Sequence, residues 1–260
     1  MTAQTSLPPE SPLTRRKRAV VVGASSGIGA ALVRRLAAED FVVAALSRSP
    51  EPLQALANEL NAGGQTRAIP YAHDVTKLDE IPAMLQRLVT ELGGVDVFIY
   101  CAGVMPKVDI NEFDLEKDQH MLSVNLAGAV AWLGQVGALF QKQRSGHLVG
   151  ISSVAGDRGR VLNPAYNASK AGLDTYLEAL RNRLSRHGVH VLTVRPGFVD
   201  TQILANAPRS FGVISPQQCA DGVWKAIKSG KQVVYVPWWW RWLMLAVRNV
   251  PSFIFRRLSF

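Results

Sequence analysis

Three polar side chains near the middle of the chain have the types and the spacing for proton transfer to a substrate oxygen. Tyr166 and Lys170 lie four residues apart in a segment with a helical pattern, which places both side chains on one helical face. A tyrosine hydroxyl, with a pKa near ~10, is a poor base at neutral pH, and a nearby ammonium lowers that pKa by stabilising the phenolate. The pair therefore predicts a tyrosine that acts as a general acid or base.

The third side chain is Ser153, which follows an apolar stretch expected to be a strand and precedes Tyr166 by thirteen residues. In doubly wound sheets, ligands bind where the strands end. The serine hydroxyl can donate a hydrogen bond to a substrate oxygen on which negative charge develops. Ser152 is an alternative, but the spacing favours Ser153. Because a tyrosine and a lysine four residues apart occur by chance in many helices, the prediction also depends on the serine and on the segment described next.

A glycine-rich turn near the start of the chain has the pattern of a dinucleotide site. An apolar run over 19–22 leads into the turn, and a helical pattern follows it. Glycines let the backbone turn sharply and approach a pyrophosphate, whose charge is met by amide N–H groups at the helix N-terminus. Glycines can also serve turn geometry alone, but the strand before and the helix after favour a nucleotide. The predicted cofactor contacts in this turn are Gly23, Ser25, Ser26, Gly27, Ile28 and Gly29.

The end of the second expected strand bears on which nicotinamide cofactor is used. An NAD enzyme places an acidic residue here against the ribose 2′-hydroxyl, whereas this chain has Ser47, Arg48 and Ser49. The Arg48 guanidinium can bind a 2′-phosphate through paired, charge-assisted hydrogen bonds. The alternative is a solvent-facing arginine at a strand end. The sequence favours NADP(H), with NAD(H) the weaker candidate.

Together these motifs resemble the short-chain dehydrogenase/reductase family, whose first loop typically reads TGxxxGIG. Val22 stands here in place of the threonine. The resemblance implies a catalytic set in which Asn125 joins Ser153, Tyr166 and Lys170, by holding a water that is linked to the lysine in a proton relay. Without the resemblance, Asn125 could instead bend a helix through local backbone bonding.

The resemblance, which covers about 19–236, implies further cofactor contacts. Asp74 corresponds to an adenine contact, although it could equally be a turn or cap residue. Cys101 stands where the family usually has asparagine before Ala-Gly. The stretch 202–214 is expected to be a mobile substrate lid. The further contacts implied are Asp74, Val75, Ala102, Gly103, Tyr166, Lys170, Pro196, Gly197 and Thr201.

The elements that must position these residues alternate along the chain. Short apolar runs alternate with longer amphipathic segments, which predicts an α/β fold with a doubly wound parallel sheet, the Rossmann fold, in a single domain. Strands are expected near 19–22, 41–46, 67–71, 95–100, 147–151, 189–194 and 233–236. Helices are expected near 27–38, 51–62, 77–92, 112–143, 164–186 and 215–229.

Length and composition limit the classes of protein that remain. A chain of 260 residues suits one large domain, expected over 18–237 after a flexible leader over 1–17 that lacks the apolar run of a secretory signal. The two cysteines form no CxxC pair and the five histidines have no ligand spacing, so no metal site is expected. These features favour a reducing, cytoplasmic setting.

The segment 238–260 differs in character from the rest, with tryptophans, four arginines and no acidic residue. Its apolar runs are too short to span a bilayer, but tryptophans beside arginines suit a helix lying at the lipid headgroup level. The alternative is that the tail packs on the protein's own core or on a neighbouring subunit. With 169–174, the tail resembles decaprenylphosphoryl-keto-sugar reductases, which act beside an epimerising oxidase in mycobacterial cell-wall synthesis.

These observations predict an enzyme that reduces a ketone, or oxidises a secondary alcohol, on an apolar or lipid-linked substrate. It is expected to form a homo-oligomer in the cytoplasm, with a peripheral position on the inner membrane face if the tail binds lipid. The alternative function is a catalytically silent cofactor-binding regulator or scaffold, against which the intact catalytic residues argue. The net charge of +9 leaves nucleic-acid binding to consider, but no nucleic-acid motif accompanies it, and no such partner is expected.

Overall fold

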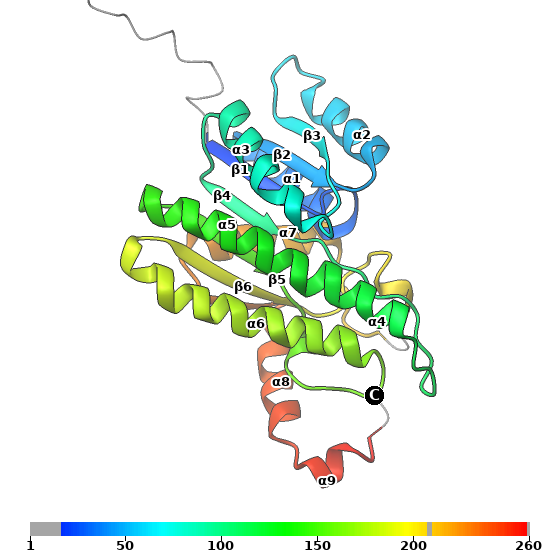
Figure 1. Ribbon diagram of the computed structural model, residues 1–260. Helices are drawn as coiled ribbons and strands as arrows, with labels where there is room; N and C mark the ends of the chain where they lie inside the picture. Colours follow the sequence, from blue (N-terminus) through cyan, green and yellow to red (C-terminus); the bar gives the residue numbers. More distant parts are fainter. Residues whose placement is uncertain (1–16, 207–209, 259–260) are drawn as a thin grey trace, which may run out of the picture.

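The computed structural model describes residues 17–206 and 210–258, and a seven-stranded parallel sheet lies at its centre (Figure 1). The strands lie in the order β3-β2-β1-β4-β5-β6-β7, so that the chain changes direction across the sheet between β1 and β4. This is the predicted doubly wound topology, and each strand agrees with its expected range to within two residues. The strands are β1 (Lys17–Val22), β2 (Phe41–Ser47), β3 (Ala68–Ala72), β4 (Val97–Tyr100), β5 (His147–Ile151), β6 (His190–Pro196) and β7 (Val233–Val236).

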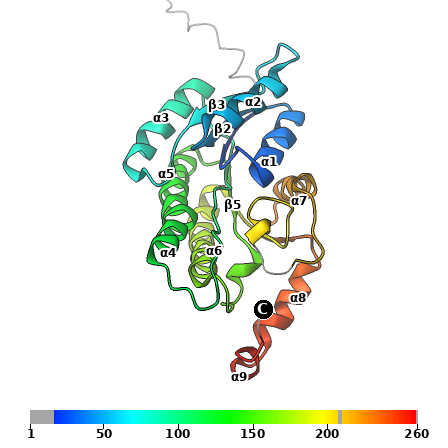
Figure 2. The ribbon, with the colours of Figure 1, turned by 90° about the vertical axis from the view of Figure 1, so that its right-hand side faces the viewer.

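Helices cover both faces of the sheet, and Figure 2 shows the two layers on either side of the strands. One layer contains α1, α2 and α7, and the other contains α3, α5 and α6. The helices are α1 (Gly27–Ala38), α2 (Pro50–Asn61), α3 (Ile81–Leu92), α4 (Leu115–Leu122), α5 (Gly128–Gln143), α6 (Pro164–Leu184), α7 (Pro216–Lys228), α8 (Trp240–Asn249) and α9 (Ser252–Phe255).

The apolar strand sequences follow from burial on both faces. All seven residues of β2 are buried, and neighbours along a strand face opposite layers. Val21 and Val43 pack in the layer of α1 and α7, whereas Val20 and Val42 pack in the layer of α5 and α6. The core therefore consists of two apolar clusters, one on each face of the sheet.

The long helix expected over 112–143 begins at Leu115 and contains a π-helical turn, η3 (Ser123–Ala127). Asp114 is the N-cap of α4, and its side chain accepts a hydrogen bond from the backbone N–H of Lys117 (3.0 Å). By length and hydropathy, Leu115–Gln143 could cross a membrane. Its apolar residues are accounted for by the sheet, because Trp132 and Phe140 are fully buried in the cluster that covers one face.

The tail extends from the end of the sheet where the strands finish (Figures 1 and 2). Trp240 and Met244 of α8 are nonetheless buried, in a cluster with Val154. The guanidinium of Arg158 donates to the backbone oxygens of Val247 and Val250 (both 2.6 Å). The inner face of α8 thus belongs to the packing of the domain, as the alternative reading of the tail expected. The leader predicted over 1–17 lies outside the described residues, apart from its last residue in β1.

Candidate active site

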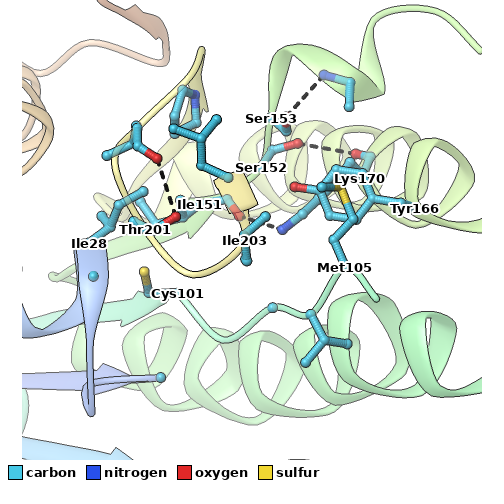
Figure 3. A pocket seen from close by; sticks show the side chains of 18 of the residues that line it. Ile28, Cys101, Met105, Ile151, Ser152, Ser153, Tyr166, Lys170, Thr201 and Ile203 are labelled. Carbon is cyan, nitrogen blue, oxygen red and sulfur yellow. Dashed lines mark hydrogen bonds between the residues drawn. The ribbon is translucent and has the colours of Figure 1, made fainter. Parts of the chain in front are cut away.

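A cavity of about 760 Å³ opens where β1, β4, β5 and β6 end, at the point where the chain changes direction across the sheet. Its lining includes every cofactor and catalytic residue predicted from the sequence except Asn125. Figure 3 shows Ser153, Tyr166 and Lys170 close together within this cavity, with Ile28 and Thr201 farther along it. The fold therefore brings together the glycine turn near the N-terminus and the central tyrosine helix.

The glycine turn fits the pyrophosphate of a nicotinamide dinucleotide. Gly23 has a φ of +88°, and a Cβ there would lie only 2.5 Å from the backbone nitrogen of Ala102. Helix α1 begins at Gly27, its N-cap Ser26 forms no side-chain cap, and its first turn has no acidic residue. The first amide N–H groups of α1 thus face the cavity without a competing side chain, as an anion site requires.

Arg48 and Asp74 lie at the outer end of the cavity, where β2 and β3 finish. The Arg48 side chain is exposed and has no ion pair with any residue that the structure describes. Asp74 accepts hydrogen bonds from the backbone N–H and the hydroxyl of Thr76 (2.9 and 2.8 Å), and these bonds lower the pKa of its carboxyl, as does the nearby Arg48 charge. Asp74 therefore caps its own turn, the alternative left open by the sequence, while it also lines the cavity.

Ser153 and Tyr166 lie side by side at the inner end of the cavity. Ser153 follows β5, its oxygen accepts from the backbone N–H of Ala155 (3.1 Å), and its hydroxyl is near enough to Tyr166 to lower the pKa of the tyrosine. The rival serine, Ser152, is buried and donates to the backbone oxygen of Lys170 (3.2 Å). Ser152 thus holds the helix in place, and Ser153 is the serine that is available to a substrate.

Lys170 is buried beneath the tyrosine, with its ammonium 5.8 Å from the centre of the Tyr166 ring. Its Nζ donates to the backbone oxygen of Ile151 (3.1 Å), and burial lowers the pKa of Lys170 to about 8. The sequence predicted that this ammonium lowers the pKa of Tyr166. In the structure, burial raises the pKa of Tyr166, and the groups that oppose this effect are Ser153 and Arg160. The four-residue spacing placed Tyr166 and Lys170 close together, but it gave no information on how deeply the two side chains are buried.

Asn125 lies in the π-helical turn η3 and is fully buried. Its amide donates to the backbone oxygen of Val104 (2.9 Å) and to the Ser169 hydroxyl (3.2 Å), while its oxygen accepts from the backbone N–H of Val104 (2.8 Å). Asn125 therefore fixes the loop after β4 against the catalytic helix. Its implied part in a water relay to Lys170 stays a prediction.

The family model of short chain dehydrogenases matches residues 17–210 of this chain. The chain belongs to the short-chain dehydrogenase family. With its glycine turn, Tyr166 and Lys170 in one cavity, it is an NAD(P)-dependent oxidoreductase acting on CH–OH and C=O groups.

Relatives and solved structures agree with this assignment. An uncharacterized oxidoreductase of Myxococcus xanthus (strain DK1622) is 37% identical, over 85% of this chain and 88% of that protein. Ketoacyl reductase HetN of Nostoc sp. (strain PCC 7120) is 33% identical, over 85% of this chain and 78% of that protein. A variant of actinorhodin polyketide ketoreductase with NADPH is 28% identical with a TM-score of 0.78, over 86% of this chain and 96% of that one. A Sphingobium yanoikuyae short-chain dehydrogenase in complex with NADPH shares the fold, with a TM-score of 0.79 and 22% identity, over 91% of this chain and 97% of that one.

One side of the cavity is formed by α8, which was not predicted from the sequence to line it. Trp240, Leu243, Met244 and Val247 of α8 line the cavity beside Phe198. A Cβ at Gly197 would lie 1.8 Å from the Trp240 ring nitrogen, so Gly197 is required by the tail as well as by its expected cofactor contact. The three- and four-residue spacing of the apolar residues in α8 was the signal that could have identified this buried face.

The expected lid over 202–214 contributes Ile203 and Leu204 to the cavity. Asn206 donates to the backbone oxygen of Met105 (2.8 Å), and the Phe211 ring lies 5.2 Å from that of Trp240. The part of the lid at 207–209 lies outside the described residues. The lid thus contacts both the loop after β4 and the tail, while its mobility stays a prediction.

Proposed function

We propose that this dehydrogenase uses NADP(H) to interconvert a ketone and a secondary alcohol on an apolar substrate. The observation that carries the proposal is one cavity with the Ser153 and Tyr166 hydroxyls at its inner end and the apolar face of α8 as its wall. Two of the similar proteins support the ketone, since one is named a ketoacyl reductase and another a polyketide ketoreductase.

The chain's own residues supply the proton chemistry. When bound, the reduced nicotinamide provides a hydride for the carbonyl carbon. The Ser153 hydroxyl donates a hydrogen bond to the carbonyl oxygen as negative charge develops there, and Tyr166 gives that oxygen its proton. Lys170 is held by the backbone oxygen of Ile151 and supplies positive charge beneath the tyrosine as the phenolate forms.

The preference for NADP(H) rests on the charge at the outer end of the cavity. Arg48 follows β2 where an NAD enzyme would have an acidic side chain, and it has no ion pair among the described residues. A 2′-phosphate would give the guanidinium a partner of opposite charge. The similar polyketide ketoreductase, whose structure holds NADPH, is consistent with this choice.

A series of methyl ketones tests the proposed function. If α8 forms the substrate wall, kcat/KM with NADPH should rise with alkyl chain length, by up to about fourfold per methylene, because a buried methylene contributes roughly 0.8 kcal/mol. Initial rates for chains of four to twelve carbons give the dependence. No turnover across the series would contradict the proposed reaction, and rates independent of chain length would contradict the apolar wall.

We also propose that the outer face of the tail binds an anionic membrane surface. Trp238 and Trp242 are 72% and 59% exposed, and Phe253 and Ile254 of α9 are also exposed. Arginines accompany these residues, which is the composition of an interfacial helix. Such a position would bring a lipid-linked ketone to the cavity wall and would explain the resemblance to decaprenylphosphoryl-keto-sugar reductases. A cytoplasmic location and a homo-oligomeric state stay predictions alongside it.

Vesicle binding tests the tail without removing the cavity wall, which deletion of 238–260 would do. The triple variant Arg241→Gln, Arg256→Gln, Arg257→Gln should lose binding to anionic vesicles, because each basic residue near such a surface contributes roughly 1 kcal/mol. Co-sedimentation with phosphatidylglycerol and phosphatidylcholine vesicles measures the loss.

A matched control removes the same charge from the opposite end of the molecule, through Lys142→Gln, Arg183→Gln and Arg186→Gln. The control variant should bind as the wild type does, and wild-type binding should weaken as salt is added. Equal binding to neutral and anionic vesicles, or equal losses in the two triple variants, would contradict a lipid-binding tail.

A further inference from the structure

Arg160 is a cationic side chain in the substrate end of the cavity; its charge opposes the rise in the pKa of Tyr166, but the proposed chemistry gives it no contact with the substrate. It lies in the loop between η4 (Val154–Gly156) and α6, lines the cavity and is partly buried. No hydrogen bond or ion pair joins its guanidinium to any residue in 17–206 or 210–258. A partly buried charge without a partner is costly. This cost would be relieved by an anion brought into the cavity.

Asn163, three residues later, supplies a second polar group of the same kind. It lines the cavity, is only 6% exposed, and its side-chain oxygen has no hydrogen-bond partner in the described structure. Its backbone is left-handed, with a φ of +53°. Such conformations are uncommon outside glycine, although asparagine adopts them more readily than most residues, and they occur at ligand sites. The loop therefore presents two unsatisfied polar side chains to one space.

The groups around this loop do not satisfy the Arg160 charge. Among the described residues that line the cavity, Asp74 is the only one with a carboxylate, and it lies at the outer, adenine end. Asp157, in the same loop, attracts the Arg160 guanidinium but forms no ion pair with it, and its Oδ1 is bound by the Arg195 guanidinium (3.0 Å). The cofactor pyrophosphate would be met by the first turn of α1, which begins at Gly27. An anion beside Arg160 would therefore have to come from the substrate.

We propose that Arg160 binds an anionic oxygen group, a carboxylate or a phosphate, on the substrate, and that the unpartnered Asn163 oxygen accepts a hydrogen bond from a substrate hydroxyl beside it. This inference rests on the proposed function, because it places the anionic group in the cavity that holds Tyr166. Arg160 would form charge-assisted hydrogen bonds to the anion, and the Asn163 carboxamide would bind a neighbouring hydroxyl. The substrate class becomes a ketone with an anionic group at one end and an apolar part against α8.

Binding of simple amphiphiles tests the site without any need for turnover. Octyl phosphate, octanoate and 1-octanol are titrated by calorimetry into the full-length protein saturated with NADP⁺. Arg160→Gln should weaken binding of at least one of the two anions by about tenfold or more, and should leave 1-octanol unchanged. The anion with the larger loss identifies phosphate or carboxylate as the group that the site prefers.

Three further variants sharpen the result. Arg160→Lys should retain part of the anion affinity, and Asn163→Gly, which keeps the left-handed backbone and removes the carboxamide, should lose less than Arg160→Gln. Arg186→Gln, exposed and outside the cavity, should match the wild type. The inference is overturned if the wild type binds neither anion better than 1-octanol, if Arg160→Gln weakens all three ligands alike, or if it weakens NADP⁺ instead. None of these results depends on ketone reduction, so the inference and the proposed function can fail separately.

Discussion

Tyr166→Phe should lower the rate of ketone reduction by about 10²–10⁴-fold while the affinity for NADPH stays unchanged, because the substitution removes only the proton donor. The Tyr166 ring is buried and lies over Lys170, and phenylalanine fills the same volume. The loss should therefore come from the chemical step and not from unfolding. Steady-state rates, together with NADPH titration by fluorescence, separate the two effects.

The control for this variant is Tyr176→Phe, on the same helix. The Tyr176 hydroxyl donates to the backbone oxygen of Val130 (3.2 Å), outside the cavity, so its loss should leave the rate near that of the wild type. If Tyr166→Phe kept more than about a tenth of the wild-type rate, the assignment of Tyr166 as the acid would be wrong.

Arg48→Ala should weaken NADPH binding by about ten- to a hundredfold and leave NADH binding nearly unchanged. The guanidinium can contact the 2′-phosphate that distinguishes the two cofactors, and a charge-assisted hydrogen bond contributes roughly 1.5–3 kcal/mol. Because Arg48 is exposed and has no ion pair with a described residue, its removal should not destabilise the fold. Dissociation constants for both cofactors, measured on both proteins, give the comparison.

Arg183→Ala, exposed near the far end of α6, is the matched control and should leave both affinities unchanged. Equal weakening of NADPH and NADH by Arg48→Ala would show that Arg48 does not discriminate between them. A preference for NADPH would then have to come from another side chain at the outer end of the cavity.

The sheet could be predicted from the sequence because its signals are local. A run such as 41–46, apolar at every position, is expected of a parallel strand covered on both faces, and the whole of β2, including the polar Ser47 at its end, is buried. Tyr166 and Lys170 could be placed together because helical geometry fixes the relation of residues four apart. The proximity of Ser153 to Tyr166 could be predicted from the family motif and from the order of the strands.

Features that depend on contacts between distant segments could not be predicted in the same way. The pKa of Tyr166 is set by the depth of its burial and by Arg160 in another loop, and neither is visible in the spacing of Tyr166 and Lys170. Trp240 appeared to belong to an aromatic tail, yet it packs against Gly197 at the cavity. Asn163 gives no sequence signal, because its left-handed backbone and unpartnered oxygen arise only once the loop is packed.

The alternative of a catalytically silent scaffold is not supported by the assembled site. A scaffold would need to bind the cofactor, but it would not require a serine and a tyrosine hydroxyl in one cavity beside a buried lysine. The family assignment points the same way. The proposed function therefore depends on hydride transfer within this cavity.

Isotope transfer tests that claim most directly. The wild-type protein is incubated with a ketone that it turns over and with NADPH carrying deuterium at both positions of the reactive nicotinamide carbon, and the alcohol is analysed by mass spectrometry and NMR. We expect one deuterium at the carbinol carbon of the alcohol that the wild type forms, and nearly no labelled alcohol with Tyr166→Phe. Alcohol without deuterium at that carbon, or labelled alcohol formed equally fast by the variant, would contradict the proposed function.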